Sequence, residues 1–264
     1  MDLKLKDKIA LITGASRGLG FATAKLLASE GARIAINSRS RGNLQKAATE
    51  IKASQQDAEP LLLAGDITQP STPEEIIQQT VAHWGGLDIL IANAGGPPSG
   101  KFENFTDEDW KAAFELSFLS QVRLIRAAIP FLKQSSCASV LTVTSFSVKQ
   151  PIPNLILSNS IRAATVGLTK SLALELGNEN IRFNSILPAW TETERVLELI
   201  AFRARQNNTS VQIELDKQAQ ESPLGRMAQP EEFAAAAVFL VSPVASYITG
   251  AMFSVDGGMY KGTF

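Results

Sequence analysis

The sequence of 264 residues contains only one cysteine, one histidine and two tyrosines. A single thiol, Cys137, cannot form an internal disulfide, and the apolar run after it favours a buried structural role over a nucleophilic one. His83 lies at the end of an expected helix, where a cation is favourable, so it too is expected to be structural. Because no grouping of side chains has the spacing of metal ligands, no metal site is expected.

Long hydrophobic runs and excess charge are also missing. No run of 18 apolar residues occurs, which argues against a membrane-spanning helix. The opening residues, MDLKLKDK, lack the apolar segment of a signal peptide. The net charge of −1 gives no electrostatic basis for binding nucleic acid or an anionic membrane surface. We therefore expect a soluble, cytoplasmic protein.

Apolar runs of strand length alternate with segments of helical periodicity along the whole chain. The expected strands are 9–12, 32–37, 61–67, 87–96, 139–145, 181–187 and 250–255. The expected helices include 44–54, 73–83, 106–131 and 155–176, with Thr106 as an N-cap. This repetition predicts an α/β fold, a doubly wound Rossmann domain whose parallel seven-stranded sheet carries helices on both faces. Because no linker or internal repeat is visible, residues 1–264 are expected to form a single domain.

The stretch Lys8–Gly20 places three glycines between an expected strand and an expected helix. Gly14 allows a tight turn, Gly18 lets the backbone approach a ligand, and Gly20 lets the helix pack closely on the strand. The N-terminus of such a helix offers free N–H groups and a partial positive charge to a pyrophosphate. The spacing departs from G-x-G-x-x-G, and the alternative interpretation is a glycine-rich turn without a ligand.

The residues after the second expected strand bear on the choice of cofactor. An acidic residue there favours NAD, whereas an arginine favours the 2′-phosphate of NADP. The sequence from Asn37 to Arg41 has no carboxylate and two arginines, Arg39 and Arg41, and Arg17 in the glycine turn adds a third cation. Guanidinium groups match phosphates bidentately, so NADP(H) is expected to be preferred over NAD(H). The alternative for Arg39 and Arg41 is a solvated surface pair.

One region breaks the alternation of strands and helices. Residues 191–222 have a helix-forming composition and contain no expected strand. They follow the sixth strand, whose carboxyl end should face the ligand crevice, so they are expected to form a flap or lid over a substrate. An ordinary pair of surface helices is the alternative.

Several motifs together resemble the short-chain dehydrogenase/reductase family, especially 3-oxoacyl-acyl-carrier-protein reductases. They are TGASRGLG at 13–20, Asp66-Ile67, Asn93-Ala94-Gly95, the loop 188–193, and SPLGRMAQPEEFA, ITG and VDGG toward the C-terminus. The resemblance covers nearly the whole chain. It implies a carbonyl, alcohol or 3-oxoacyl thioester substrate and a homotetramer. The cofactor contacts implied or expected are Gly14, Ser16, Arg17, Gly18, Leu19, Gly20, Ser38, Arg39, Asp66, Ile67, Asn93, Ala94, Gly95, Arg162, Pro188, Thr191 and Thr193.

Catalysis in this family uses Asn, Ser, Tyr and Lys, and three of these four positions are altered here. Ser145 matches the family serine, which binds the carbonyl oxygen. Ser158 stands at the tyrosine position, Arg162 at the lysine position and Ser117 at the asparagine position. A phenol has a pKa of about 10 that a neighbouring lysine lowers, whereas a serine hydroxyl is a much weaker acid and arginine stays protonated. The four residues therefore predict a polar site that is better suited to binding than to proton transfer.

Other charged residues are candidates for the proton donor in place of the family tyrosine. Lys149 follows Ser145 by four positions, and Glu192, Glu194 and Arg195 lie where the flap begins. Each is weighed against an ordinary surface charge, because only geometry decides between the two.

Two functions of different classes remain open from the sequence. The first is an NADP(H)-dependent oxidoreductase that transfers hydride between nicotinamide and a carbonyl or alcohol. The second is a catalytically impaired nucleotide-binding protein of reductase ancestry that serves as a sensor or subunit. Both rest partly on the resemblance, because a fold alone does not specify a function.

Overall fold

One parallel sheet organises the computed structural model, which describes residues 1–263. Its strand order is β3-β2-β1-β4-β5-β6-β7, which confirms the doubly wound α/β prediction. The strands are β1 (Ile9–Ile12), β2 (Arg33–Ser38), β3 (Leu61–Ala64), β4 (Ile89–Ala92), β5 (Ser139–Val143), β6 (Arg182–Pro188) and β7 (Met252–Val255). β3 and β4 end earlier than expected, because Gly65 and Asn93 leave the sheet at its carboxyl edge and line a cleft there.

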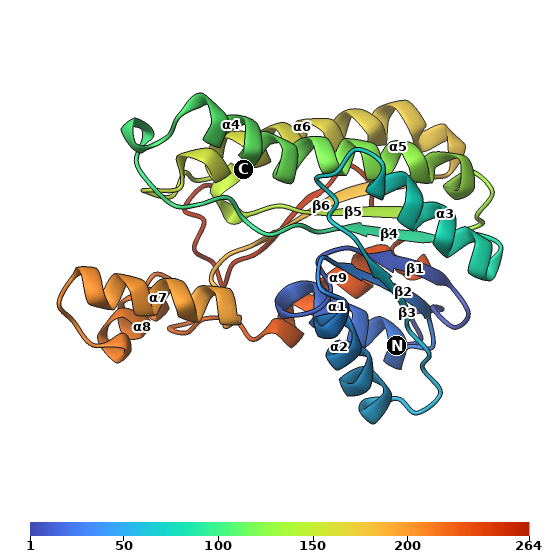
Figure 1. The fold of residues 1–264 in the computed structure, drawn as a ribbon, viewed down its shortest axis with the longest axis horizontal. Coiled ribbons are helices and arrows are strands. Elements are labelled where there is room, and N and C mark those ends of the chain that lie inside the picture. Colours follow the sequence, from blue (N-terminus) through green and yellow to red (C-terminus); the bar gives the residue numbers. More distant parts are fainter. Residues whose placement is uncertain (264) are drawn as a thin grey trace.

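Helices cover both faces of the sheet (Figure 1). One face carries α1 (Gly18–Ser29), α2 (Arg41–Ser54) and α9 (Pro230–Val241). The other carries α3 (Thr72–Trp84), α4 (Asp107–Phe114), α5 (Ser120–Leu132) and α6 (Ile156–Leu176). The sheet is therefore the central layer of three.

Side-chain alternation in the strands explains why both faces are covered. In β1, Ala10 and Ile12 belong to the core under α1, α2 and α9, whereas Leu11 belongs to the core under α3 and α5. All three side chains are fully buried. Successive residues of a strand point to opposite faces, so a strand buried on both faces consists of a continuous apolar run.

The expected helix at 106–131 is divided by a change in helical pitch. Thr106 caps α4, since its hydroxyl accepts from Asp109 N at 3.3 Å. The Asp109 carboxylate in turn accepts from Thr106 N at 2.9 Å. A π-helical turn, Glu115–Leu119, then joins α4 to α5. Such turns carry an extra residue per turn, and they rotate the side chains around them relative to a regular helix.

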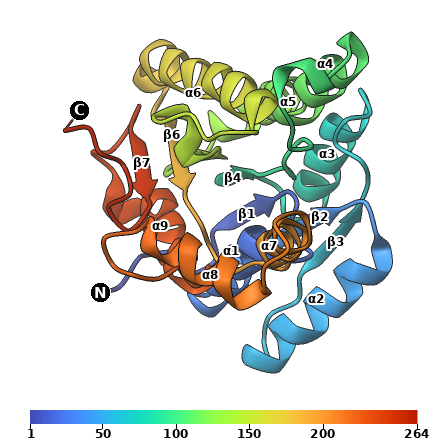
Figure 2. The ribbon, with the colours of Figure 1, turned by 90° about the vertical axis from the view of Figure 1, so that its left-hand side faces the viewer.

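The segment after β6 forms two helices outside the sheet layers, α7 (Glu194–Gln206) and α8 (Val211–Gln220). They project from the left side of the molecule in Figure 1, and Figure 2 looks directly onto them. We call residues 191–222 the flap. α7 packs mainly against α8, and Glu214 of α8 is buried at 8% exposure, where it accepts hydrogen bonds from Lys217, Thr209 and Asn207.

Across residues 1–263, none of the helices has the length and apolar character that crossing a bilayer requires.

Candidate functional site

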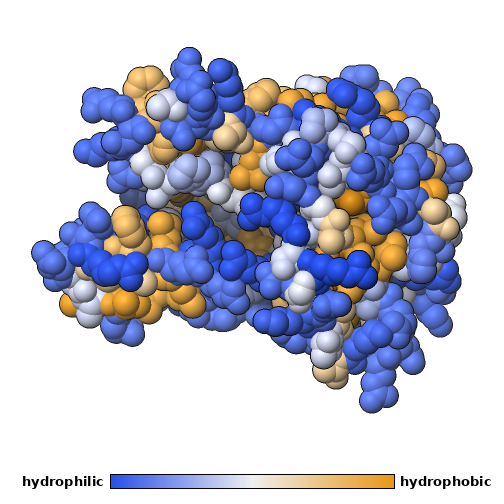
Figure 3. Space-filling model, in the orientation of Figure 1, coloured by the Kyte–Doolittle hydropathy of each residue, from blue (hydrophilic) through white to orange (hydrophobic). Residues whose placement is uncertain are grey.

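A cleft of about 900 Å³ lies at the carboxyl edge of the sheet, beside the flap. Figure 3 shows its opening between the flap and the helices above it. Strand order reverses between β1 and β4, and the crevice at such a switch point is where doubly wound folds bind ligands. Fifteen of the expected cofactor contacts line it: Gly14, Ser16, Arg17, Gly18, Leu19, Ser38, Arg39, Asp66, Ile67, Asn93, Ala94, Gly95, Arg162, Pro188 and Thr193.

The glycine turn has the geometry that its sequence predicts. Gly14 and Gly18 have φ of 58° and 59°, in the left-handed region that favours glycine. A Cβ built on Gly20 would lie 2.4 Å from the carbonyl oxygen of Gly14, so a larger residue would push the turn and helix apart. Asn93 holds the turn from β4, because its Nδ2 donates to the carbonyls of Thr13 and Gly14 at 3.2 Å each.

The end of β2 is adjacent to this turn, and it is the place where an adenosine ribose would lie. Ala15 N donates to Asn37 O at 3.0 Å, which ties the two segments together. Arg39 lines the cleft, is exposed, and makes no ion pair within residues 1–263. Asp66, at the end of β3, accepts hydrogen bonds from the backbone and hydroxyl of Thr68 at 3.0 and 2.9 Å. This end of the cleft therefore presents the guanidinium of Arg39, which no carboxylate of residues 1–263 pairs with.

Ser145 and Ser158 both lie in the cleft, at the other end from Arg39. Ser145 begins a short 3₁₀ turn (Phe146–Val148), and its Oγ accepts from Ser147 N at 3.1 Å. Its hydroxyl hydrogen is thus free to be donated to a ligand, as the prediction requires. Ser158 is half-buried near the start of α6.

Arg162, one turn after Ser158 on α6, is a buried cation. It is 7% exposed, and its Nη1 donates to the carbonyls of Val143 and Thr144 at 3.0 and 2.9 Å. Burial lowers the pKa of Arg162 to about 10, so the guanidinium stays protonated at neutral pH. No carboxylate pairs with it within residues 1–263. Its charge is held instead by the carbonyls at the end of β5, where it borders the cleft.

Three expected site residues do not line the cleft: Ser117, Gly20 and Thr191. Ser117 lies in the π-helical turn with its side chain fully buried and its Oγ without a hydrogen-bond partner. Its carbonyl already accepts from Thr165 Oγ1 at 2.9 Å and from Gln121 Nε2 at 3.2 Å. Within residues 1–263, the Ser117 carbonyl is therefore already occupied by two buried donors, whereas its Oγ has none.

The other proton-transfer candidates divide into two groups. Glu194 and Arg195 line the cleft, whereas Lys149 and Glu192 do not. Lys149 Nζ lies 5.2 Å from the ring centre of Tyr260, so the structure brings together two residues that are far apart in the sequence. A tyrosine and a lysine thus meet outside the cleft, rather than at the positions where the family has them.

Cys137 and His83, whose side chains have the most versatile chemistry, lie away from the cleft. Cys137 is half-buried rather than buried, and His83 packs edge-on against Trp84 with ring centres 4.7 Å apart. Neither lines the cleft. Nowhere in residues 1–263 do three or more His, Cys, Asp and Glu side chains gather as metal ligands would.

The apolar wall of the cleft was missed by sequence reasoning. It comprises Ala112, Leu116, Ile152, Leu155, Trp190 and Val196. Most of these read as ordinary apolar positions of helices or loops, and nothing in their spacing distinguishes a cleft wall from a core face. Only Trp190 carried a signal, because it lies in the loop 188–193 that the resemblance singled out.

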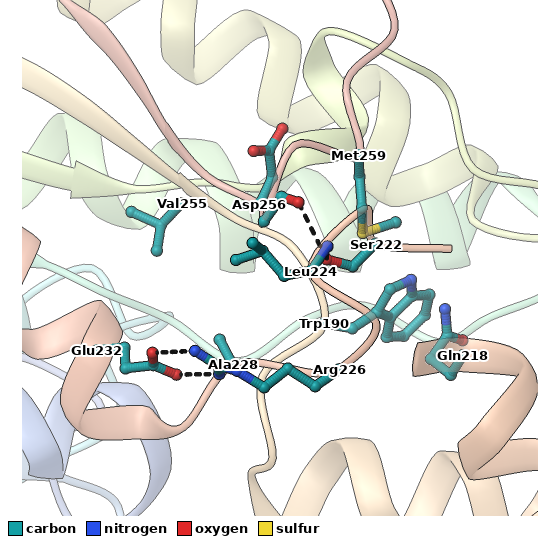
Figure 4. A pocket seen from close by; sticks show the side chains of 11 residues that line it. Trp190, Gln218, Ser222, Leu224, Arg226, Ala228, Glu232, Val255, Asp256 and Met259 are labelled. Atoms are coloured by element: carbon teal, nitrogen blue, oxygen red, sulfur yellow. Dashed lines mark hydrogen bonds and ion pairs between the residues drawn. The ribbon is translucent and has the colours of Figure 1, made fainter. Parts of the chain in front are cut away.

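Trp190 also separates the cleft from a second, smaller pocket of about 110 Å³, shown in Figure 4. Its indole Nε1 donates to Glu221 at 3.1 Å, and Arg203 of α7 lies over its ring at 5.0 Å from the centre. Arg203 in turn donates to Gln218 Oε1 at 2.8 Å. Side chains of both flap helices therefore fix the orientation of Trp190.

The parallel sheet and the cleft at its switch point define a Rossmann-type α/β protein. The family profile described as enoyl-(acyl carrier protein) reductase matches residues 14–260. NADPH-dependent reductase BacG of Bacillus subtilis (strain 168) is 31% identical over 257 residues, covering 97% of this chain and 99% of the relative. The 3-oxoacyl-(acyl-carrier-protein) reductase FabG of Thermotoga maritima is 30% identical over 257 residues, with the same coverage of 97% and 99%. The chain belongs to the short-chain dehydrogenase/reductase family.

Solved structures agree with this assignment. L-sorbose reductase from Gluconobacter frateurii, complexed with NADPH and L-sorbose, has a TM-score of 0.95 and 32% identity, covering 99% of this chain and 100% of that one. An NADPH-bound short-chain oxidoreductase from Pseudomonas aeruginosa PAO1 that contains an atypical catalytic center has a TM-score of 0.88 and 29% identity, covering 98% and 100%.

Proposed function

We propose that the protein is an NADP(H)-dependent oxidoreductase that acts on a carbonyl or alcohol and prefers NADP(H) over NAD(H). The observation that carries this proposal is the unpaired guanidinium of Arg39 at the end of β2, where no carboxylate is available for ribose hydroxyls. An arginine fork binds a 2′-phosphate, and an acidic residue would repel it. Relatives described as NADPH-dependent or solved with NADPH support the same cofactor.

The residues of the glycine turn fit a dinucleotide. The positive φ of Gly14 and Gly18 and the start of α1 at Gly18 leave backbone N–H groups toward the cleft, where a pyrophosphate is stabilised. Ser38 and Arg39 would hold the adenosine ribose and its phosphate, and Asp66 and Ile67 would lie against the adenine. The remaining proposed contacts are Ser16, Arg17, Leu19, Asn93, Ala94, Gly95, Pro188 and Thr193 from the cleft, with Gly20 and Thr191 behind it.

At the catalytic end, the proposed roles follow from what each group can donate. Bound NADP(H) would supply or accept the hydride. Ser145 would donate a hydrogen bond from its hydroxyl to the substrate oxygen, because the bond from Ser147 N occupies only an acceptor lone pair and leaves the hydroxyl hydrogen available. Arg162 would stabilise negative charge that develops on that oxygen, as a fixed cation in a water-poor site. Ser158, which lines the cleft one turn before Arg162, would donate its hydroxyl proton to the substrate oxygen as the hydride arrives and would regain a proton from solvent in the cleft.

The substrate class follows from the wall of the cleft. Leu116, Ile152, Leu155 and Val196 supply apolar surface around the polar group of Ser145 and Ser158. Pockets of this kind bury an apolar ligand and orient it through a few polar contacts. We propose a small carbonyl compound or an acyl thioester, including 3-oxoacyl thioesters of the kind named for FabG.

Cofactor preference is tested by measuring dissociation constants of NADPH and NADH for the wild type and Arg39→Ala. A charge-assisted hydrogen bond contributes enough that NADPH affinity should fall about 10- to 100-fold, with NADH unchanged. The control is Arg126→Ala, an exposed cation on α5 outside the cleft, which changes net charge equally. Equal wild-type constants for the two cofactors, or unchanged NADPH affinity in Arg39→Ala, would refute the preference.

A second function is favoured by the geometry of Arg162. Since its guanidinium is bound to strand carbonyls and Ser158 is a weak acid, the site binds well without an evident proton donor. A nucleotide-binding sensor or subunit would need no donor. Tight NADPH binding without NADPH oxidation, across a panel of ketones and 3-oxoacyl thioesters, would favour this function over the first.

We also propose a cytoplasmic homotetramer whose partners are small molecules rather than nucleic acid or membrane. The apolar segment 234–240 does not by itself indicate an interface, because most of it is buried in α9 against α1 of the same chain. The edge strand β7 does expose Met252 and Phe253, at 37% and 41%. Unpaired apolar edges favour symmetric association. Light scattering that shows a monomer at micromolar concentration would refute this assembly.

A further inference from the structure

An ion pair crosses the cleft between the glycine turn and the first residue of α7. Arg17 Nη1 lies 3.1 Å from Glu194 Oε2, and the two side chains are 57% and 68% exposed. Both residues line the cleft. Beside them, Thr193 lies against Gly18, since a Cβ built on Gly18 would be 3.5 Å from Thr193 Cγ2. These two contacts join the start of the flap to the turn.

The two arginines of the adenosine end differ in whether a carboxylate is paired with them. Arg17, Ser38 and Arg39 line one continuous cleft, and the bond from Ala15 N to Asn37 O keeps the turn beside the end of β2. Arg39 has no carboxylate partner within residues 1–263, whereas Arg17 already has one in Glu194. A phosphate that reached both arginines would find Arg39 without a carboxylate partner and Arg17 already paired with Glu194.

We propose that Glu194 is a specificity-determining residue that competes with the 2′-phosphate of the cofactor for Arg17, an inference that rests on the proposed use of NADP(H). A phosphate is bound best by two parallel N–H groups of one guanidinium, and Glu194 already accepts from Nη1 of Arg17, one of the nitrogens that can take part in such a pairing. NADP(H) must displace this carboxylate, whereas NAD(H) has no group that would do so. Glu194 thus lowers the preference for NADP(H) that Arg17 and Arg39 create.

The size of the effect follows from the exposure of the pair. Exposed ion pairs are weak, and breaking one changes an equilibrium by roughly 1.4- to 5-fold. Glu194→Gln keeps the shape of the side chain and removes its charge. It is therefore expected to tighten the binding of a 2′-phosphorylated nucleotide by about two- to five-fold.

The experiment uses two probes that lack nicotinamide, so that its outcome is independent of catalysis. Calorimetry measures 2′,5′-ADP and 5′-AMP binding to the full chain. Glu194→Gln should tighten 2′,5′-ADP and leave 5′-AMP unchanged. The matched control is Glu198→Gln, which removes an exposed carboxylate one turn further along α7, outside the cleft, and should change neither constant.

The role of Arg17 is tested in the same assay. In an Arg17→Ala background, Glu194→Gln should have no effect on 2′,5′-ADP, because the contested cation is gone. An effect that persists without Arg17, an equal gain for both probes, or no gain at all would each overturn the competition.

These outcomes remain separate from the cofactor proposal. A wild type that binds both probes equally, with discrimination appearing in Glu194→Gln, would overturn the proposed preference and support the competition. A wild type that strongly prefers 2′,5′-ADP, with no response to Glu194→Gln, would support the proposed cofactor preference and overturn the competition.

Discussion

The two ends of the cleft differ in what makes them polar. At the adenosine end, the polar groups come from the backbone of the glycine turn, whose shape depends on Gly14 and Gly18, together with the exposed guanidinium of Arg39. At the catalytic end they are side chains, and these are engaged: Arg162 is bound to Val143 and Thr144, and Ser145 caps a 3₁₀ turn. The first end offers groups to a ligand, and the second has largely satisfied its own.

The difference explains how binding and chemistry can separate within one fold. Backbone contacts depend on conformations that few residues other than glycine adopt, so the residues that make them are hard to replace. Side-chain contacts depend only on the identity of a few residues. Ser158 and Arg162 therefore change the chemistry expected at one end while the sheet, the turn and the nucleotide crevice keep their geometry.

The largest expected effect comes from restoring the family pair at the catalytic end. Ser158→Tyr with Arg162→Lys should raise kcat for NADPH-dependent reduction of a generic ketone, because a phenol beside an ammonium is a better acid. Positioned acid catalysis contributes about 10²- to 10⁴-fold, so partial recovery is measurable. NADPH affinity should change little, since Arg39 lies at the other end of the cleft. Steady-state kinetics and a binding titration measure both.

The control for this change is Ser160→Tyr with Arg162→Lys, which adds the phenol at an exposed position of α6 instead. Thermal unfolding is measured alongside, because a pocket shaped for serine strains when it receives a larger ring. If the first variant is folded, binds NADPH and shows no gain, the proton comes from elsewhere or the protein does not perform hydride transfer. A loss of wild-type activity would instead show that Ser158 and Arg162 form a working pair.

The next largest effect is on stability at the same end. Arg162→Met removes the guanidinium that donates to the carbonyls of Val143 and Thr144, and leaves both carbonyls without this side-chain donor. Unsatisfied buried carbonyls are costly, so the free energy of unfolding should fall by about 2–4 kcal/mol. Urea denaturation measures it, with Lys170→Met, an exposed cation of α6, as the control. If the free energy of unfolding falls no more in Arg162→Met than in Lys170→Met, the hydrogen bonds of Arg162 contribute little to stability.

At the other end, the glycine turn can be broken by a single methyl group. Gly20→Ala places a Cβ 2.4 Å from the carbonyl oxygen of Gly14 and 2.8 Å from Asn93 Nδ2. Overpacking of this kind costs about 1–3 kcal/mol, and here it should weaken NADPH binding as well as stability. Gly42→Ala is the control, because nothing lies within 4 Å of a Cβ there. Equal melting temperatures for the two variants would contradict the close packing of turn and helix.

The smallest effect concerns the flap that borders both ends. Hydrogen bonds from Lys217 and then Thr209 lower the pKa of Glu214 from 4.5 to about 2. A carboxyl whose folded pKa is depressed stabilises the fold above its unfolded pKa, and this contribution is lost as the pH falls through the folded pKa. The flap should therefore loosen between about pH 4.5 and 2.

Trp190 provides the measurement, because α7 holds its ring through Arg203. Its fluorescence is followed during acid titration in a protein with Trp84→Phe and Trp110→Phe. Glu214→Gln should lose stability at neutral pH and show a weaker acid transition, whereas Glu198→Gln should keep the transition. The same transition in both variants would locate the acid sensitivity outside Glu214.

Local pattern was enough to predict the sheet and the glycine turn, and most of the residues that it assigned to a cofactor line the cleft. Apolar runs and glycine positions act through neighbouring residues, so the sequence carries them directly. The catalytic end was harder to predict, because the burial and hydrogen bonds of its side chains depend on residues that are distant in the chain. Ser117 was placed on the right helix, but a π-helical turn buries its side chain, and no spacing showed that Arg162 would bind the end of β5.

The contact between Lys149 and Tyr260 could not be predicted for the same reason. It joins the turn after Ser145 to a segment that follows the last strand. The apolar wall of the cleft and the pocket behind Trp190 likewise depend on how the flap folds back, which has no local signature.

The burial of Arg162 sets an order in which a tyrosine–lysine pair could be introduced at positions 158 and 162. A lysine alone at this position would place a strongly hydrated ammonium where the broader guanidinium now serves two carbonyls, which costs more to bury. A tyrosine at 158 arriving first would provide, one turn away on the same helix face, an oxygen that accepts from that ammonium. The order that keeps each intermediate more stable therefore introduces the phenol first, and the opposite order passes through a less stable single variant.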